Sequence, residues 1–435
     1  MHKHSKLFLC VGMAVSCFSS SALAAGFQVN EHSANGLGRA FAGQAATPEN
    51  ATILTTNAAA ITQFETQQFS AVVSYIDPNV DISGELNTQV ATPDGAVVDL
   101  PPMSASEQNI ADTAIVPAAY YIRPITDKLS FGIGAFTTYG LRTDYSDDYN
   151  ALHFANDAEV KSVTLNPTLA YKVSDQLSLG LGISTTYAEA EISTATPKAI
   201  EAISGGAVPG NATIVGLEGD DWGFGWNVGL FWQPTQTTDI GVSYRAETEL
   251  ELDGEVSSDL RPELNLGGQL DLNLAAITEV AVNQEITNQW SVQASFVFTD
   301  WSTFEKLEAN LENGSDLLLK EENFDDTWRG ALGVTYKLDD VWTLRAGYAY
   351  DDGAVTTKNR SLSIPDTDRH WITAGASYAF NDTSTIDFGY AYLNGREANV
   401  NKTNDRLQAL GITSTITGRQ SANAHILSVQ YNASF

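Results

Sequence analysis

The chain has 435 residues, of which 17% are charged, and its 53 acidic against 23 basic side chains give a net charge of −30 at pH 7. Such an acidic chain is a poor partner for nucleic acid, because phosphate binding requires positive charge. Both cysteines, Cys10 and Cys17, lie in the first 24 residues. We therefore expect a mature chain with no disulfide, no thiol-bound metal and no cofactor.

Residues 1–24 have the pattern of a signal peptide. Lys3 and Lys6 precede an apolar run over residues 7–18, and Ala22-Leu23-Ala24 follows as a cleavage site. The apolar run is too short to cross a membrane, which needs about 20 residues. We predict export, removal of residues 1–24 and a mature chain that begins at Ala25.

Residues 25–66 are rich in Gly, Ala, Asn and Thr and lack strand alternation. One interpretation is a disordered tail. The other is a hatch that folds into the lumen of a barrel, since fourteen strands enclose a space too wide for side chains alone to fill. Apolar side chains such as Phe27, Leu37 and Phe41 favour the hatch over residues 25–66.

Residues 67–435 contain fourteen segments in which apolar and small or polar side chains alternate, as in β-strands. The alternation is clearest over residues 177–183, 290–298 and 342–350. Short turns alternate with long connections through the whole region, as in an outer-membrane barrel. The long connections are expected over residues 76–113, 140–159, 189–221, 250–271, 299–327, 351–368 and 393–421.

The last strand, residues 427–435, has one apolar and one polar face and ends on Phe435. In a lipid bilayer this strand must pair with the first one, because an open edge leaves backbone groups without partners. We predict an all-β fold, a 14-stranded antiparallel transmembrane barrel over residues 67–435, in the outer membrane of a Gram-negative bacterium. Lipopolysaccharide, outer-membrane lipid and the barrel assembly machinery, through the strand that ends at Phe435, are the expected partners.

Four sequence blocks resemble the FadL family, outer-membrane transporters of long-chain fatty acids and other hydrophobic compounds. They are A-G-F-Q-V-N-E at residues 25–31, G-L-G-R-A at 36–40, W-G-F-G-W-N at 222–227 and R-S-L-S-I-P-D-T-D-R at 360–369. The resemblance implies a fourteen-stranded barrel with an N-terminal hatch, in agreement with the strand count.

The resemblance also implies two gating positions. Asn57-Ala58-Ala59 stands where the family hatch carries Asn-Pro-Ala, and loss of the proline frees the backbone there. Gly140 matches a glycine at which the third strand kinks and opens a gap in the barrel wall. A ligand is expected to leave sideways through that gap into the membrane.

Ligand-binding positions depart from the family. Where the family has basic side chains, this chain has Glu189, Glu191, Asp325 and Asp326. The nearest cations are Lys320 and Arg329, which we take as candidates for holding a carboxylate.

The apolar candidates for ligand binding are Phe27 in the hatch and Ile200 and Ile203 at the outer mouth. The last two lie in a segment that is predicted to form a short amphipathic helix or to fold onto itself. Arg245, Arg329 and Arg345 fall on the polar face of their strands and are expected to point into the lumen. There they either pair with acidic side chains or contact a ligand.

The function that we predict is passive uptake of hydrophobic compounds, above all long-chain fatty acids. Uptake of neutral aromatic or alkane hydrocarbons is an alternative, and a general diffusion porin is another. An enzyme is not expected, because His32, His153, His370 and His425 stand in no recognisable nucleophile and base arrangement.

Overall fold

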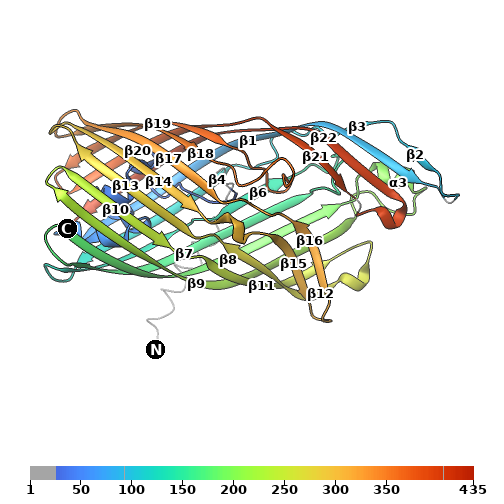
Figure 1. The fold of residues 1–435 in the computed structure, drawn as a ribbon, viewed down its shortest axis with the longest axis horizontal. Helices are drawn as coiled ribbons and strands as arrows, with labels where there is room; N and C mark the ends of the chain where they lie inside the picture. The colour runs from blue at the N-terminus through green and yellow to red at the C-terminus, as the bar shows by residue number, and fades with distance from the viewer. Residues whose placement is uncertain (1–25, 93, 405) are drawn as a thin grey trace.

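The computed structural model describes residues 26–92, 94–404 and 406–435, so the expected signal peptide lies outside the described residues. Within them, fourteen antiparallel spanning strands form a closed barrel. Figure 1 shows the barrel lengthwise, with short turns at one end and long extensions at the other. The spanning strands are β1 (Gln68–Ala91), β4 (Ala114–Pro124), β5 (Leu129–Phe136) continued by β6 (Gly140–Asp144), β7 (Asp157–Lys172), β8 (Leu177–Ala195), β9 (Thr213–Thr235), β10 (Thr238–Arg245), β13 (Ile277–Glu285), β14 (Trp290–Thr299), β17 (Thr327–Lys337), β18 (Trp342–Asp351), β19 (Arg369–Asn381), β20 (Ser384–Gly395) and β22 (Ile412–Ser434).

The first and last strands close the barrel, as the sequence predicts. β1 pairs with β22 from Gln68 opposite Ser434 to Val90 opposite Ile412. Because the first and last strands pair with each other, the sheet has no open edge there, and backbone groups within the bilayer keep their hydrogen-bond partners. No helix within the described ranges is both long and apolar enough to cross a membrane.

The long connections are mostly extensions of the sheet. β1 continues to Ala91 against β22, well past residue 76, where a connection was expected to begin. The shorter strands beyond the membrane region are β2 (Val97–Asp99), β3 (Met103–Ser104), β11 (Thr248–Ser257), β12 (Leu266–Leu274), β15 (Lys306–Leu311), β16 (Asp316–Glu321) and β21 (Ala398–Asn404). Helices α3 (Ala199–Ile203), η4 (Pro262–Leu264), η5 (Trp301–Thr303) and η6 (Gln408–Leu410) lie between them.

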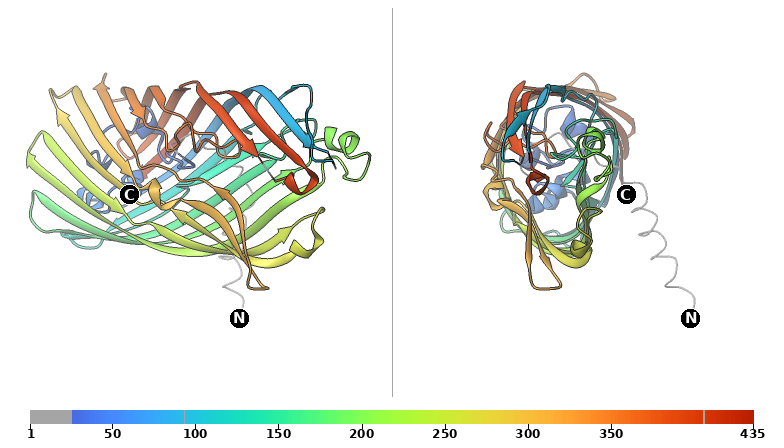
Figure 2. Two further views of the ribbon diagram at one scale, coloured as in Figure 1. Left: turned by 45° about the vertical axis from the view of Figure 1, so that its right-hand side comes forward. Right: turned by 90° about the vertical axis from the view of Figure 1, so that its right-hand side faces the viewer.

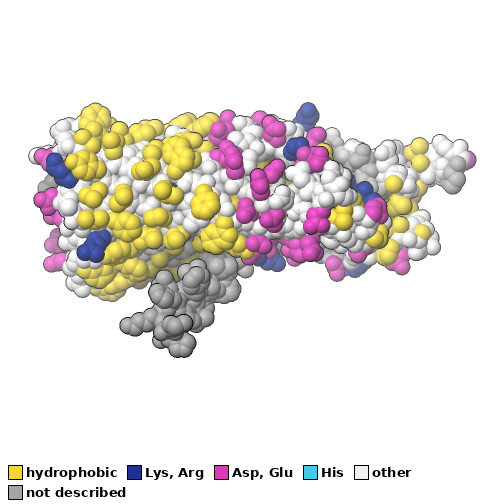
Figure 3. All heavy atoms as spheres, turned by 90° about the horizontal axis from the view of Figure 1, so that it is seen from below, with side chains coloured by type: hydrophobic (Ala, Val, Ile, Leu, Met, Phe, Trp, Pro, Cys, Tyr) yellow, Lys and Arg dark blue, Asp and Glu magenta, His cyan; other side chains and the backbone are white. Residues whose placement is uncertain are grey.

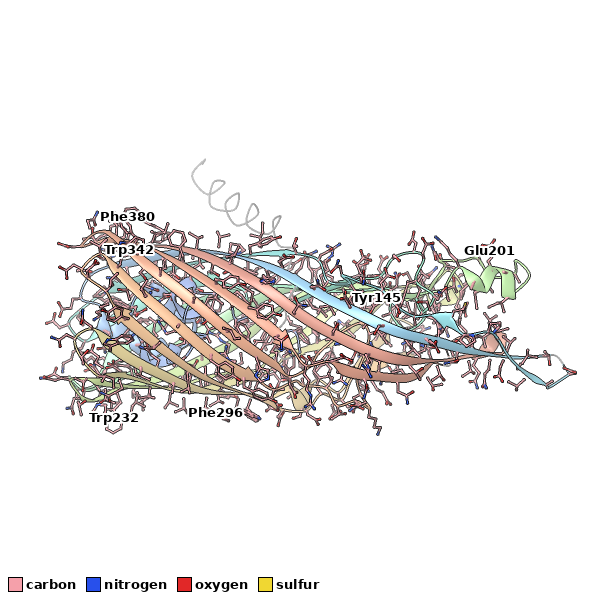
Figure 4. The ribbon with its side chains drawn as sticks, turned by 90° about the horizontal axis from the view of Figure 1, so that it is seen from above. Tyr145, Glu201, Trp232, Phe296, Trp342 and Phe380 are labelled. Carbon is pink, nitrogen blue, oxygen red and sulfur yellow. The ribbon has the colours of Figure 1, made fainter. Side chains whose placement is uncertain are left out.

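On the face drawn in Figure 3, apolar side chains cover the short-turn half of the barrel, and acidic side chains gather next to them toward the extensions. Exposed apolar side chains of the spanning strands include Leu332 and Ile372. Trp342 and Phe380 lie at the short-turn end, and Phe296 lies further along the wall (Figure 4). Aromatic side chains at a band edge are typical of membrane interfaces.

The hatch fills the lumen of the short-turn half, where the end-on view of Figure 2 shows it inside the ring of strands. It consists of α2 (Ala34–Leu37), η1 (Gln44–Ala46), η2 (Ala51–Thr55) and η3 (Ala58–Gln63). Polar side chains cap three of these elements, α2, η2 and η3. Ser33 Oγ accepts from the Gly36 N–H at 3.1 Å, and Asn57 Oδ1 accepts from the Ala59 N–H at 3.0 Å.

The hatch backbone touches the wall where the strands carry glycine. A Cβ at Gly241 on β10 would lie 2.0 Å from the Ala45 carbonyl oxygen, and one at Gly229 on β9 would lie 2.1 Å from Asn57 Oδ1. Only glycine allows this approach. The sequence thus reserves space on the inner wall for the hatch.

Candidate functional site

A groove with both apolar and polar walls opens among the extensions, at the end of the barrel opposite the short turns. It has a volume of about 650 Å³. Its walls come from segments far apart in the chain, brought together because the extensions lean over the lumen. The apolar part of the lining consists of Phe154, Ile214, Val215, Leu317, Leu318, Leu319 and Leu362.

Four basic side chains, Arg261, Lys320, Lys402 and Arg406, also line this groove, together with one acidic side chain, Glu321. Lys320 Nζ donates to Ser361 Oγ at 2.5 Å and lies 3.5 Å from Glu322 Oε1. Burial lowers the pKa of Lys320, and the neighbouring Glu322 carboxylate opposes this effect. Arg406 donates to the Leu319 carbonyl oxygen. The groove therefore offers positive charge next to apolar surface.

The groove is continuous with an apolar cluster in the lumen. Val215 and Leu319 belong both to the groove and to this cluster. The cluster extends down to Phe27 of the hatch, whose ring centre lies 4.7 Å from that of Trp301, 5.4 Å from Phe304 and 5.8 Å from Tyr139. Apolar contacts thus run from the mouth to the beginning of the hatch.

The barrel wall is interrupted between β5 and β6. β4 pairs with β5 from Ala119 opposite Ala135 to Pro124 opposite Ser130, toward the short-turn end. In the described chain no strand pairing joins β4 to β6. Above the interruption, the Asp144 N–H donates to the Ile110 carbonyl oxygen at 2.8 Å, and Arg142 Nε lies 2.9 Å from Asp112 Oδ2. The wall between these two levels lacks a ladder of hydrogen bonds.

The start of the hatch lies against this interruption from the inside. The Val29 N–H donates to the Thr138 carbonyl oxygen at 2.7 Å, and the Gly140 N–H donates to the Phe27 carbonyl oxygen at 2.9 Å. Gln28 and Tyr139 form the bridge between these two bonds. The segment of residues 26–29 therefore satisfies backbone groups that the missing strand pairing leaves open.

The structure places the predicted gating residues at the hatch and the wall. Gly140 is the first residue of β6, directly after the interruption. Asn57 caps η3, and its Nδ2 donates to the carbonyl oxygens of Ala45 at 2.8 Å and Leu230 at 3.0 Å. Asn57 thus ties the hatch to β9 without the proline that the family resemblance leads one to expect.

The predicted ligand-binding residues are distributed over three places. Phe27 lies in the luminal cluster and Lys320 in the groove. Arg329 lies deeper, in a separate cavity between the hatch and the wall. Ile200 lies in α3, the short helix that is one of the two predicted forms of this segment. Its side chain packs with Ile203 and Ile214 in one apolar cluster. Ile200 is only 2% exposed, so its side chain supports the groove wall from within a packed cluster.

Sequence reasoning missed Arg261, Lys402 and Arg406 as groove residues. Arg261 lies in the connection over residues 250–271, whereas Lys402 and Arg406 both lie in the connection over residues 393–421, and only the packing of these connections makes the three residues neighbours of Lys320. No spacing in the sequence signals that contact. Among the described residues no group of three or more His, Cys, Asp or Glu side chains is arranged to hold a metal ion.

Comparisons with known proteins agree with this arrangement. A "Long-chain fatty acid transport protein" of Escherichia coli O6:H1 is 37% identical over 394 residues, covering 84% of this chain and 86% of the relative. "Outer membrane protein P1" of Haemophilus influenzae is 32% identical over 461 residues, covering 99% of this chain and all of the relative. The crystal structure of a Pseudomonas aeruginosa FadL homologue has a TM-score of 0.81 at 24% identity and covers 94% of this chain and 100% of its own.

A closed barrel with a hatch in its lumen and a partly apolar groove above it is a transport channel of the Gram-negative outer membrane. The chain belongs to the family described as "Outer membrane protein transport protein (OMPP1/FadL/TodX)", which matches residues 15–435. This confirms the resemblance drawn from the four sequence blocks. Members of the family transport hydrophobic compounds and are channels rather than enzymes. The Pseudomonas putida toluene transporter TodX shares the fold, with a TM-score of 0.63 at 17% identity over 88% of this chain and 94% of its own.

Proposed function

We propose that this channel takes up long-chain fatty acids by passive diffusion. The observation that carries the proposal is the groove at the mouth, where four basic side chains adjoin a lining of leucine, isoleucine, valine and phenylalanine. A carboxylate leaves water at a lower cost when a cation replaces its hydration, and an acyl chain gains by leaving water for apolar surface. The groove matches both ends of a fatty acid.

The route continues through the luminal cluster. Because Val215 and Leu319 contact both groove and cluster, an acyl chain advances by displacing side chains that are already in apolar contact. The cluster ends at Phe27, which belongs to the segment of residues 26–29 that lies against the wall interruption. Movement of residues 26–29 away from Thr138 and Gly140 would join the lumen to the gap and release the ligand sideways into the membrane. Consumption of the ligand inside the cell then sustains the gradient.

The two alternative functions have less support. A neutral aromatic hydrocarbon or alkane can use the apolar lining of the groove, but it has no anionic group to pair with Arg261, Lys320, Lys402 and Arg406. A general diffusion porin needs a water-filled lumen. Here the hatch occupies the lumen with buried side chains such as Leu37, Phe41 and Leu54.

Binding of radiolabelled oleate and toluene to the purified barrel tests the proposal. We expect saturable oleate binding that weakens about tenfold when Lys320→Gln and Lys402→Gln are combined, since each removes a charge-assisted contact. Lys128→Gln, at an exposed turn of the short-turn end, serves as the matched control and should bind oleate like the wild type. Saturable binding of toluene without oleate would overturn the proposal.

The further partners stay predictions. The acidic outer wall next to the apolar surface, with Glu189 and Glu218 on neighbouring strands, is where we expect lipopolysaccharide. The barrel assembly machinery is expected to recognise β22. Deletion of Phe435 should then slow the appearance of folded barrel in cells, measured as the form that resists unfolding in cold detergent.

A further inference from the structure

A buried carboxylate lies directly behind the outer groove. Glu322 follows the last residue of β16, and residues 317–321 of that strand line the groove. The Glu322 side chain is 0% exposed, and neither of its carboxylate oxygens has a hydrogen-bond partner among the described residues. A carboxylate in such a place is costly unless a cation lies close to it. Here that cation comes from the groove itself.

Lys320 contacts Glu322 and also lines the groove. Its Nζ lies 3.5 Å from Glu322 Oε1, whereas it donates to Ser361 Oγ at 2.5 Å. Charge-assisted hydrogen bonds between nitrogen and oxygen are usually about 2.7–2.9 Å long, so the contact with Glu322 is a loose ion pair. The Lys320 side chain keeps 19% of its surface exposed. An anion that enters the groove can therefore compete with Glu322 for Lys320.

Glu322 also acts on a second basic side chain of the groove, Lys402. Burial lowers the pKa of Lys402, and the charges of Glu322 and Glu321 oppose that effect. Conversely, burial raises the pKa of Glu322, and the charges of Lys320 and Lys402 oppose the rise. One internal carboxylate therefore offsets part of the positive charge with which the groove attracts an anion.

The burial of Glu322 distinguishes it from the two acidic residues of β16. Asp316 and Glu321 are exposed to water, which screens their charges, so that they act weakly on neighbouring groups. The enclosed carboxylate of Glu322 lacks this screening. Its charge accordingly opposes the lowering of the Lys402 pKa more strongly than the charge of the exposed Glu321 does.

We propose that Glu322 is an internal counter-anion of the groove, which neutralises Lys320 and Lys402 while the groove is empty and competes for them with the carboxylate of a bound ligand. The inference rests on the proposed function and deepens it, because it names the residue that sets the affinity of capture. A channel site must bind its ligand strongly enough to collect it and weakly enough to release it. Glu322 supplies the second condition, since its return to Lys320 favours departure of the head group.

Glu322→Gln tests this role, because it keeps the shape of the side chain and removes its charge. The dissociation constant of radiolabelled oleate for the purified barrel should fall roughly tenfold, since the ligand carboxylate no longer has a competitor. Binding of oleyl alcohol, which has no charge, should stay the same. In cells without another fatty-acid channel, uptake at saturating oleate should slow, because a ligand that is held more tightly at the mouth leaves it more slowly.

Two further variants isolate the charge of Glu322. Asp316→Asn removes an acidic charge from an exposed position of the same hairpin and should match the wild type with both ligands. In a Lys320→Met background, Glu322→Gln should lose most of its effect on oleate binding, because the carboxylate acts mainly through Lys320. That double variant buries no unpaired charge at this contact, so it also serves if Glu322→Gln alone fails to fold. Heat-dependent migration in detergent gels establishes that each variant is folded.

Three outcomes with folded protein would overturn the role of Glu322 and leave the proposed function intact. They are oleate binding that is unchanged or weaker in Glu322→Gln, an equal gain for oleyl alcohol, and uptake that does not slow. Weaker binding in particular would mean that the carboxylate only positions Lys320. Failure of the wild-type barrel to bind oleate would instead overturn the proposed function and this inference with it.

Discussion

Glu49 of the hatch and Arg345 of strand β18 form an ion pair across the hatch and wall, with 3.1 Å between Glu49 Oε2 and Arg345 Nη2. The same oxygen accepts from Arg39 Nη1 at 3.0 Å. Arg39 is fully buried, and its Nε also donates to the Ala42 carbonyl oxygen. One carboxylate thus joins two guanidiniums and connects the middle of the hatch to the barrel. For Arg345, the structure thus shows the first of the two predicted roles, pairing with an acidic side chain.

Glu49→Gln should loosen the hatch. The substitution leaves Arg39 buried without a counter-charge, which costs roughly 3 kcal/mol in comparable sites. We expect faster amide exchange over residues 26–66 and a higher single-channel conductance in planar bilayers, with the barrel itself still folded. Glu65→Gln, at an exposed position of the same segment, should change neither quantity. Conductance equal to that of the wild type would show that Glu49 does not hold the hatch.

The Glu49 pair also predicts a pH dependence. Burial raises the pKa of Glu49, but the charges of Arg345 and Arg39 outweigh it and lower that pKa from 4.5 to about 2. The stabilisation is therefore fully present above pH 4.5 and is lost as the pH falls from 4.5 toward 2. Amide exchange of the hatch should be constant between pH 7 and pH 5, after correction for intrinsic rates, and should accelerate below 4.5. In Glu49→Gln this acid-dependent acceleration should disappear.

A disulfide between the hatch and the wall interruption should block release. Gln28 and Tyr139 face each other in an antiparallel bridge, and the backbone hydrogen bonds on either side of it are made by their neighbours in the chain. In such a non-hydrogen-bonded pair the side chains lie close together, as in pairs that accept a disulfide. Oxidised Gln28→Cys with Tyr139→Cys should bind oleate but stop its uptake, and a reductant should restore uptake. Each single cysteine variant, insensitive to oxidation, provides the control. Undiminished uptake by the cross-linked protein would contradict movement of residues 26–29.

Gly241→Ala should displace the hatch from β10. The added methyl group would lie 2.0 Å from the Ala45 carbonyl oxygen, which belongs to the backbone and has no rotamer to change. We expect a lower unfolding temperature for the hatch and faster amide exchange around η1. Gly330→Ala is the matched control, because its added Cβ would meet only the Trp328 ring, at 3.4 Å. If the two variants are equally stable, the hatch has more freedom at this contact than the structure indicates.

Much of the fold follows from the sequence because strand patterns are local. The alternation of side chains, the short turns and Phe435 at the end of the last strand predict fourteen spanning strands and a closed barrel, and the structure has them. The four sequence blocks add the family, which the comparisons confirm. Period-two alternation reports on one strand at a time and needs no knowledge of distant residues.

The site depends instead on contacts between distant residues. The sequence identified Lys320 and Arg329 as the nearest cations, but only the tertiary structure separates them, with Lys320 in the outer groove and Arg329 in the inner cavity. Arg261, Lys402 and Arg406 meet Lys320 because three long connections lean over one lumen, an arrangement set by barrel closure. The sequence by itself determined that the chain forms a barrel, since each strand carries its own pattern, and the resemblance to the family added the hatch. The tertiary structure decided where its charges meet, since those charges lie on segments that only the closed sheet brings together.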